Sequence, residues 1–140
     1  MSPAERLIAE HERVGTARFT APEYKPGEVV HIVLFRLNDT VSESDRAEVT
    51  RRFLALGQAC LRDGKPYIRD IVAGTPNGGE GVERGYELGF VLRFASEGDR
   101  NFYAGVPNPT DPAHKAFQGF VGPLLAEGGV LVFDFATGRP

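Results

Sequence analysis

The chain has 140 residues, of which 41% are hydrophobic and 25% charged, and its net charge is -3 at pH 7. This composition predicts one globular domain with a single core. The acidic balance and the lack of a basic stripe argue against nucleic-acid binding, and no apolar run reaches the roughly 18 residues of a membrane span. The single cysteine, Cys60, excludes an intramolecular disulfide, so we expect a cytoplasmic protein.

Residues 1–27 are expected to form an extension in front of a domain that spans residues 28–140. Ser2 and Pro3 are typical of a helix start, as the N-cap and the first helical position. A narrow apolar stripe follows at helical spacing and consists of Leu7, Ile8, His11 and Val14. The prolines and the glycine of "TAPEYKPGE" then end the helix. Because this segment is too short for its own core, we expect it to pack on the domain or on a partner subunit.

The first half of the domain shows a strand, a helix and a second strand. "VVHIVLFRL" predicts a strand that is apolar on both faces. Ser42, with Asp45 three residues later, predicts the start of a helix, and "DGKP" is expected to end it. The apolar face of this helix consists of Val49, Phe53, Leu56 and Cys60. A short, more polar run near residues 67–73 predicts an edge strand before a glycine-rich loop.

The second half shows the same kinds of element in the order strand, helix, helix, strand. "YELGFVLRF" predicts a strand, and one of its faces carries Tyr86, Leu88, Phe90, Leu92 and Phe94. A short helix is expected near residues 96–104. In "NPTDPAHKAFQGF", Asp111 fits an N-cap, Pro112 the first helical position and His114 the third. "GVLVFDF" predicts the last strand, with Val130, Val132 and Asp134 on one face and Leu131, Phe133 and Phe135 on the other.

The order β-α-β-β-α-β predicts a ferredoxin-like α+β sandwich, in which helices cover one face of a four-stranded antiparallel sheet. Three of the strands are nevertheless apolar on both faces. In the first strand, for example, Ile32 and Leu34 lie opposite Val33 and Phe35. A monomer would expose a sheet-sized apolar patch to water, which soluble proteins seldom do. We therefore expect a homodimer that packs sheet against sheet.

Four segments together resemble one known family. They are "HIVLFRL", "RGYELGFVLRF", "DPAHKAF" and "VLVFDF", and their order and spacing between residues 29 and 135 resemble the stress-responsive A/B barrel (Dabb) domain. The resemblance implies a dimeric α/β barrel. Within this family, the chain is similar to polyketide cyclases of the olivetolic acid cyclase type. These enzymes are lyases that close a linear poly-β-ketone by intramolecular aldol condensation, without metal or organic cofactor.

The resemblance implies roles for individual residues. His114 matches the catalytic histidine and Tyr103 its partner tyrosine, while His31 and Asp134 match two further site residues. Leu88 departs from the pattern, because it stands where the cyclase has a histidine. A helix N-terminus disfavours a charged imidazole, so His114 is expected to stay neutral and accept a proton from a methylene between two ketones. Tyr103 would then donate a hydrogen bond to the enolate oxygen.

Several functions stay open on the sequence alone. The first is the cofactor-free cyclase with His114 as base and Tyr103 as donor. The second is a non-catalytic, stress-associated dimer that binds a small apolar molecule, in which His114 bonds a backbone carbonyl or Asp134. The third is a cofactor-independent monooxygenase. We expect no metal, because His31, His114 and Asp134 lack the spacing of metal ligands.

Asp134 needs a partner if it is buried, and we expect it to orient a histidine or to cap a neighbouring backbone. A further group of side chains is expected in the core, where it would line a pocket if a cavity exists. This group consists of Val33, Phe35, Val49, Phe53, Phe117, Val130 and Val132.

Overall fold

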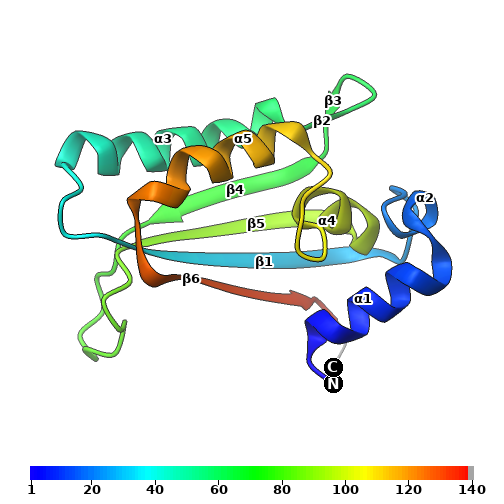
Figure 1. Cartoon of the computed structure of the whole chain (residues 1–140), viewed down its shortest axis with the longest axis horizontal. Helices are drawn as coiled ribbons and strands as arrows, with labels where there is room; N and C mark the ends of the chain where they lie inside the picture. Colours follow the sequence, from blue (N-terminus) through cyan, green and yellow to red (C-terminus); the bar gives the residue numbers. More distant parts are fainter. Residues whose placement is uncertain (139–140) are drawn as a thin grey trace.

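The computed structural model of the chain describes residues 1–138. Its centre is a four-stranded antiparallel sheet in the order β4-β5-β1-β6 (Figure 1). The strands are β1 (Pro26–Leu37), β4 (Ile68–Gly74), β5 (Leu88–Ser96) and β6 (Leu125–Ala136). This order confirms the ferredoxin-like α+β prediction. It also places β4, the short polar strand, at an edge of the sheet as its sequence predicts.

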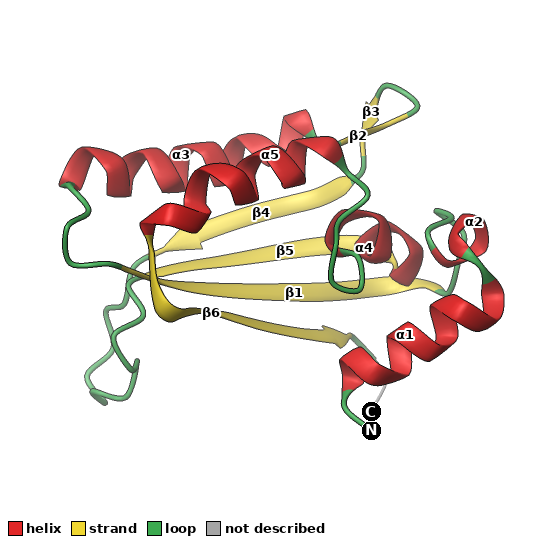
Figure 2. Cartoon of the chain, viewed as in Figure 1, coloured by secondary structure: helices red, strands yellow, loops and turns green. Residues whose placement is uncertain are grey.

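Three helices belong to the domain, and Figure 2 shows them beside the sheet. They are α3 (Glu43–Ala59), α4 (Glu97–Ala104) and α5 (Pro112–Val121). α3 and α5 pack against each other, while α4 lies against β1 and β5. A short 3₁₀ turn, η1 (Gly122–Leu124), leads from α5 into β6. The expected N-caps are present, since Ser42 accepts a hydrogen bond from the Asp45 amide at 3.1 Å and Asp111 one from the Ala113 amide at 2.8 Å.

The core lies between the sheet and the two long helices. The apolar face predicted for α3 is buried there, and so are the alternating residues of β5, Leu88, Phe90, Leu92 and Phe94. Four aromatic rings, Phe35, Phe53, Phe90 and Phe117, fill the middle of this layer. Their nearest centroids are 4.1 Å apart, for Phe53 and Phe90, and 4.9 Å apart, for Phe53 and Phe117. Burial of these rings is a large favourable term in the stability of the domain.

A small hairpin corrects one prediction from the sequence. α3 ends at Ala59, and β2 (Leu61–Arg62) then pairs with β3 (Lys65–Pro66). "DGKP", which we expected to end the helix, instead forms this hairpin. Asp63 and Gly64 sit at its tip with φ of 51° and 75°, the positive values that an Asp-Gly hairpin turn requires. The turn residues were identified correctly, but their partner strands are too short to show a pattern.

The extension begins with the predicted helix, α1 (Pro3–Val14), and continues with a short second helix, α2 (Thr16–Phe19). No residue of α1 is buried, so the apolar stripe predicted for it is not a core face. The extension is instead anchored further along, where Phe19 and Tyr24 are buried. We therefore infer that residues 15–25 fasten the extension to the domain.

In the part of the chain that the structure describes, no helix packs on the second face of the sheet, and this face exposes apolar side chains, as the two-faced strands predict. The pairing of β6 with β1 places Leu131, Phe133 and Phe135 on this face, and Phe133 is 60% exposed. Ile32 and Leu34 lie beside them on β1. Among residues 1–138, no helix is long and apolar enough to cross a membrane.

Candidate active site

Three aromatic side chains from three different elements meet at one end of the domain. His31 comes from β1, Tyr103 from α4 and His114 from the first turn of α5. The rings of Tyr103 and His114 are stacked, with centroids 3.8 Å apart and an interplanar angle of 8°. The His31 ring meets Tyr103 edge-to-face at 5.7 Å. The residues that the sequence motifs singled out are therefore brought together, and we call them the ring cluster.

His114 is held in one tautomer. Its Nδ1 lies 2.7 Å from the backbone carbonyl oxygen of Tyr103, and a carbonyl only accepts hydrogen bonds, so Nδ1 carries the proton. Burial is the largest cause that lowers the pKa of His114 below its ordinary 6.5, and nearby His31 lowers it further. Burial acts in the same direction as the helix terminus, which the sequence predicts to disfavour the charged ring. At neutral pH the ring is uncharged and Nε2 keeps its lone pair.

Tyr103 contributes an unpaired donor. It is fully buried, and its hydroxyl has no hydrogen-bond partner within the described part of the chain. Burial raises the pKa of Tyr103 well above its ordinary value, with nearby Cys60 and Asp111 adding to the effect, so the hydroxyl stays protonated. A buried donor without an acceptor costs about 1–3 kcal/mol. A ligand oxygen that accepted this hydrogen bond would remove that cost.

Asp134 binds a histidine, as the sequence predicts, and the histidine is His31. The Asp134 Oδ1 lies 2.6 Å from Nδ1 of His31, and Oδ2 accepts from Nη1 of Arg100 at 3.0 Å. Burial alone would raise the pKa of Asp134, but the bonds and charges of His31 and Arg100 outweigh it and lower the pKa. The carboxylate is therefore ionised.

Arg100 is the site residue that the sequence reasoning missed. It is only 8% exposed, which is unusual for an arginine. The sequence contains one indication that Arg100 lies near the site. Arg100 and Tyr103 are three positions apart in a helix and therefore share a face. Its partner Asp134, however, lies 34 residues further along the chain, and sequence spacing alone does not show that contact.

The predicted pocket lining divides into two groups. Five of its members, Val33, Phe35, Val49, Phe53 and Phe117, are buried in the packed core, so side chains fill the space where the sequence allowed for a cavity. The prediction that Val130 and Val132 are core residues is wrong. They are 46% and 51% exposed.

The exposure of Val130 and Val132 has a clear geometric cause. Their pairing with Phe35 and Val33 puts them on the helix-covered face of the sheet. α5 packs beside α3 rather than over β6, and Figure 1 shows β6 on the flank opposite these helices. The inner face of β6 is therefore open to water. The Asp134 side chain, next along this face, is 22% exposed, so the water-exposed part of this face extends to the carboxylate that binds His31.

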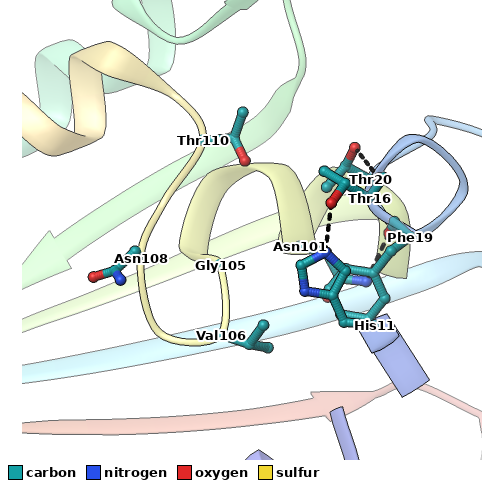
Figure 3. Close-up of a pocket in the computed structure, with 9 residues that line it drawn as sticks. All are labelled: His11, Thr16, Phe19, Thr20, Asn101, Gly105, Val106, Asn108 and Thr110. Carbon is teal, nitrogen blue, oxygen red and sulfur yellow. Dashed lines mark hydrogen bonds between the residues drawn. The ribbon is translucent and has the colours of Figure 1, made fainter. Parts of the chain in front are cut away.

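A separate hollow lies away from the ring cluster. It has a volume of about 190 Å³ and lies between the extension and the loop after α4 (Figure 3). Its lining includes His11, Thr16, Asn101 and Asn108 but none of the predicted site residues. Within residues 1–138, no three or more His, Cys, Asp or Glu side chains are grouped so that they could hold a metal ion.

The fold is that of a ferredoxin-like α+β domain, and its ring cluster brings two histidines and a tyrosine together. The stress responsive A/B barrel domain (Dabb) matches residues 29–137, and the chain belongs to this family. Comparison with curated proteins gives no match.

Solved structures share the fold. A hydroxynitrile lyase from Passiflora edulis is 19% identical, with a TM-score of 0.65 over 82% of this chain and 97% of that one. A protein from Arabidopsis thaliana is 22% identical, with a TM-score of 0.67 over 80% and 97% of the two chains. A dimeric ferredoxin-like protein of unknown function from Thermobifida fusca is 25% identical, with a TM-score of 0.59 over 81% and 95%.

Proposed function

We propose that this chain is a cofactor-free lyase of the polyketide cyclase type, with His114 as base and Tyr103 as donor. The observation that supports this most directly is the hydrogen bond from His114 Nδ1 to the Tyr103 carbonyl. It leaves a neutral imidazole with its lone pair on Nε2, stacked on the Tyr103 ring, whose buried hydroxyl has no acceptor among the described residues. A base and a donor in this arrangement suit carbon acids next to carbonyl groups.

The proposed reaction is an intramolecular aldol closure. Nε2 of His114 takes a proton from a methylene between two ketones, and Tyr103 donates a hydrogen bond to the enolate oxygen. The enolate carbon then attacks a distant ketone of the same molecule, which forms the carbon–carbon bond and an alkoxide. The imidazolium returns its proton to that alkoxide, so the protein ends unchanged. General acid–base catalysis of this kind contributes about 10²- to 10⁴-fold in rate.

The open inner face of β6 supports an apolar substrate. Val130 and Val132 are exposed there although they belong to the face that the helices cover elsewhere. A substrate chain lying along these side chains would remove apolar surface from water, at about 25 cal/mol per Å². Its reactive end would lie toward Asp134 and the ring cluster.

Two observations favour a different function, the non-catalytic binding dimer. His114 bonds a backbone carbonyl, that of Tyr103, as this alternative expects. The phenylalanine rings also fill the space between the sheet and α3, so the exposed inner face of β6 is the surface that we propose for a ligand. If this surface only binds apolar molecules, ligands will stabilise the protein without being converted. The experiment below separates the two functions.

We also propose that the protein is a homodimer formed through the open sheet face. Phe133 and Phe135 are exposed on that face, and the Thermobifida fusca structure with the same fold is described as dimeric. Residues 28–140 would form the dimerising domain and residues 1–27 its extension. The cytoplasmic location stays a prediction from the single cysteine.

The test compares the wild-type chain with His114→Ala and with Lys115→Ala, a matched control that removes an exposed side chain next to His114 on α5. The substrates are a panel of linear poly-β-ketones, with a hydroxynitrile as a second class, and products are followed by mass spectrometry. The proposal expects ring closure by the wild type and by Lys115→Ala, and none by a folded His114→Ala.

Equal turnover by His114→Ala and wild type would reject the proposal. Thermal stabilisation by a poly-β-ketone without any product, equal in both proteins, would favour the binding dimer. Loss of product under anaerobic conditions would instead identify an oxygenase.

A further inference from the structure

Arg100 is a buried cation with a defined set of partners. Its Nη1 lies 3.0 Å from Asp134 Oδ2, its Nε donates to Asn101 Oδ1 at 2.9 Å, and its Nη2 lies 3.7 Å from Glu97. Removing a guanidinium from water costs several kcal/mol unless such partners compensate. These contacts therefore fix where the guanidinium lies.

Asp134 links this guanidinium to His31. One carboxylate oxygen accepts from Arg100 and the other from His31 Nδ1. Because each oxygen has its own donor on a different element, rotation of the carboxylate would break at least one bond. The His31 ring is thereby held with Nδ1 protonated and with its edge against Tyr103.

The opposite side of Arg100 leads to the N-terminal extension. Asn101, which is fully buried, accepts from Arg100 and donates from Nδ2 to the Phe19 carbonyl at 2.9 Å (Figure 3). The first amides of α4 also bond to the extension, since Gly98 N donates to the Tyr24 carbonyl at 3.0 Å. A continuous chain of hydrogen bonds thus connects the extension to His31.

The extension approaches α4 so closely that only glycine fits at one position. A Cβ atom added to Gly98 would lie 1.7 Å from the carbonyl oxygen of Ala21. Any side chain there would push the extension away from α4. The close contact between Gly98 and Ala21 therefore depends on the absence of a side chain at position 98.

We propose that Arg100 is a positioning residue, which fixes Asp134 and through it His31, and that the N-terminal extension holds Arg100 in place through Asn101. The extension then helps to position the side chains of the site. The kinetic part of this inference rests on the proposed function, but the geometric part does not.

The first experiment replaces Arg100 and a matched control arginine. Arg100→Met removes the guanidinium, while Arg62→Met removes another α4-bound arginine, which pairs with Asp99 at 3.2 Å and does not touch Asp134. NMR follows the His31 Nδ1 proton, which is shifted downfield by its bond to a carboxylate. We expect Arg100→Met to lose or shift this signal and Arg62→Met to keep it.

Activity gives an independent measurement on the same proteins. We expect kcat of Arg100→Met to fall about 10- to 100-fold with KM nearly unchanged, as misplacement of a catalytic group does. Arg100→Lys keeps the charge and should recover part of both the signal and kcat.

The second experiment displaces the extension without touching Arg100. Gly98→Ala introduces the clash with Ala21, and Gly119→Ala is the control, because a Cβ there meets nothing within 4 Å. We expect Gly98→Ala to shift the His31 signal and to lower kcat, and Gly119→Ala to change neither.

An unchanged His31 signal in both Arg100→Met and Gly98→Ala would overturn the inference. If the His31 signal shifts in the two variants but the wild-type protein turns over no substrate, only the proposed function is overturned. The two failures are therefore distinguishable.

Discussion

His114 is a neutral, partly buried histidine, and its neutrality has a consequence for stability. Its pKa is lowered mainly by burial, from the ordinary 6.5 that the unfolded chain retains. Below about pH 6.5 the unfolded state therefore binds more protons than the folded state. The free energy of unfolding should fall as the pH falls through this window, by at most about 1.4 kcal/mol per pH unit from this one group.

Urea unfolding between about pH 5 and pH 7 measures this dependence. His114→Gln should flatten it, because glutamine does not titrate, and His11→Gln should leave it unchanged. A slope in His114→Gln equal to that of the wild type would mean that His114 is not the group responsible.

Asp134 affects stability at lower pH. Its folded pKa lies below the ordinary 3.8 because the bonds from His31 and Arg100 outweigh the effect of burial. Its contribution to stability is complete above about pH 4 and is lost as the pH falls through the folded pKa. Asp134→Asn removes this contribution and leaves Arg100 without the closer of its two carboxylate partners, which should cost about 3 kcal/mol at neutral pH.

Chemical denaturation of the variants at neutral pH tests this magnitude. Asp70→Asn is the control. Asp70 is exposed and forms an ion pair with Arg93 at 3.7 Å, and such exposed pairs contribute less than about 1 kcal/mol to stability. Equal losses in the two variants would show that the Asp134 contacts are as weak as a surface ion pair.

Site residues could be predicted from the sequence where they lie in a recognisable motif. The segments around His31, Tyr103, His114 and Asp134 pointed to residues that the structure brings close together. Arg100 was not predictable, because its burial depends on a strand that follows much later in the chain. Propensity and spacing describe local neighbours, whereas a buried charge is defined by distant ones.

At the scale of secondary-structure elements, the start of α5 positions His114. Asp111 caps this helix with one oxygen, which accepts from Ala113 N at 2.8 Å, and with the other accepts from the Tyr67 hydroxyl at 2.6 Å. Asp111→Ala loses a cap worth about 1 kcal/mol and also the bond from Tyr67. We expect a loss of about 2–3 kcal/mol in the free energy of unfolding.

Ser42→Ala is the matched control. Ser42 caps α3 by accepting from the Asp45 amide, and its further hydrogen bond is with Ser44 in the same helix, whereas Tyr67 binds Asp111 from a distant part of the chain. Ser42→Ala should cost about 1 kcal/mol. A double-mutant cycle with Tyr67→Phe isolates the additional bond. If Asp111→Ala costs no more than Ser42→Ala, the Tyr67 bond does not stabilise this helix start.

The periodicity of apolar residues predicted well which face of β5 and of α3 is buried. The inward residues of β5 and the apolar face of α3 are buried as expected. The error concerns β6, where the alternation of Val130 and Val132 was correct but their burial was not. Alternation determines which face a side chain occupies, and only the placement of α5 beside α3 determines whether that face is covered.

At the scale of the whole molecule, the two-faced strands support the proposed dimer. One face of the sheet is covered by helices, while the other presents Leu131, Phe133 and Phe135 to water. Isolated monomers rarely keep such a patch exposed. A second copy of the same face would cover it with a two-fold axis, which is the simplest closed assembly.

Phe133→Glu tests this assembly directly. Phe133 is 60% exposed in the single chain, and a two-fold dimer would bury two copies of the new carboxylate. Two unpaired carboxylates in an apolar interface should weaken association by at least about 4 kcal/mol, or roughly 1000-fold. Val82→Glu is the control, because Val82 is 59% exposed but lies in the glycine-rich loop. Light scattering at micromolar concentration should show a dimer for the wild type and Val82→Glu and a monomer for Phe133→Glu, whereas a dimeric Phe133→Glu would place the interface elsewhere.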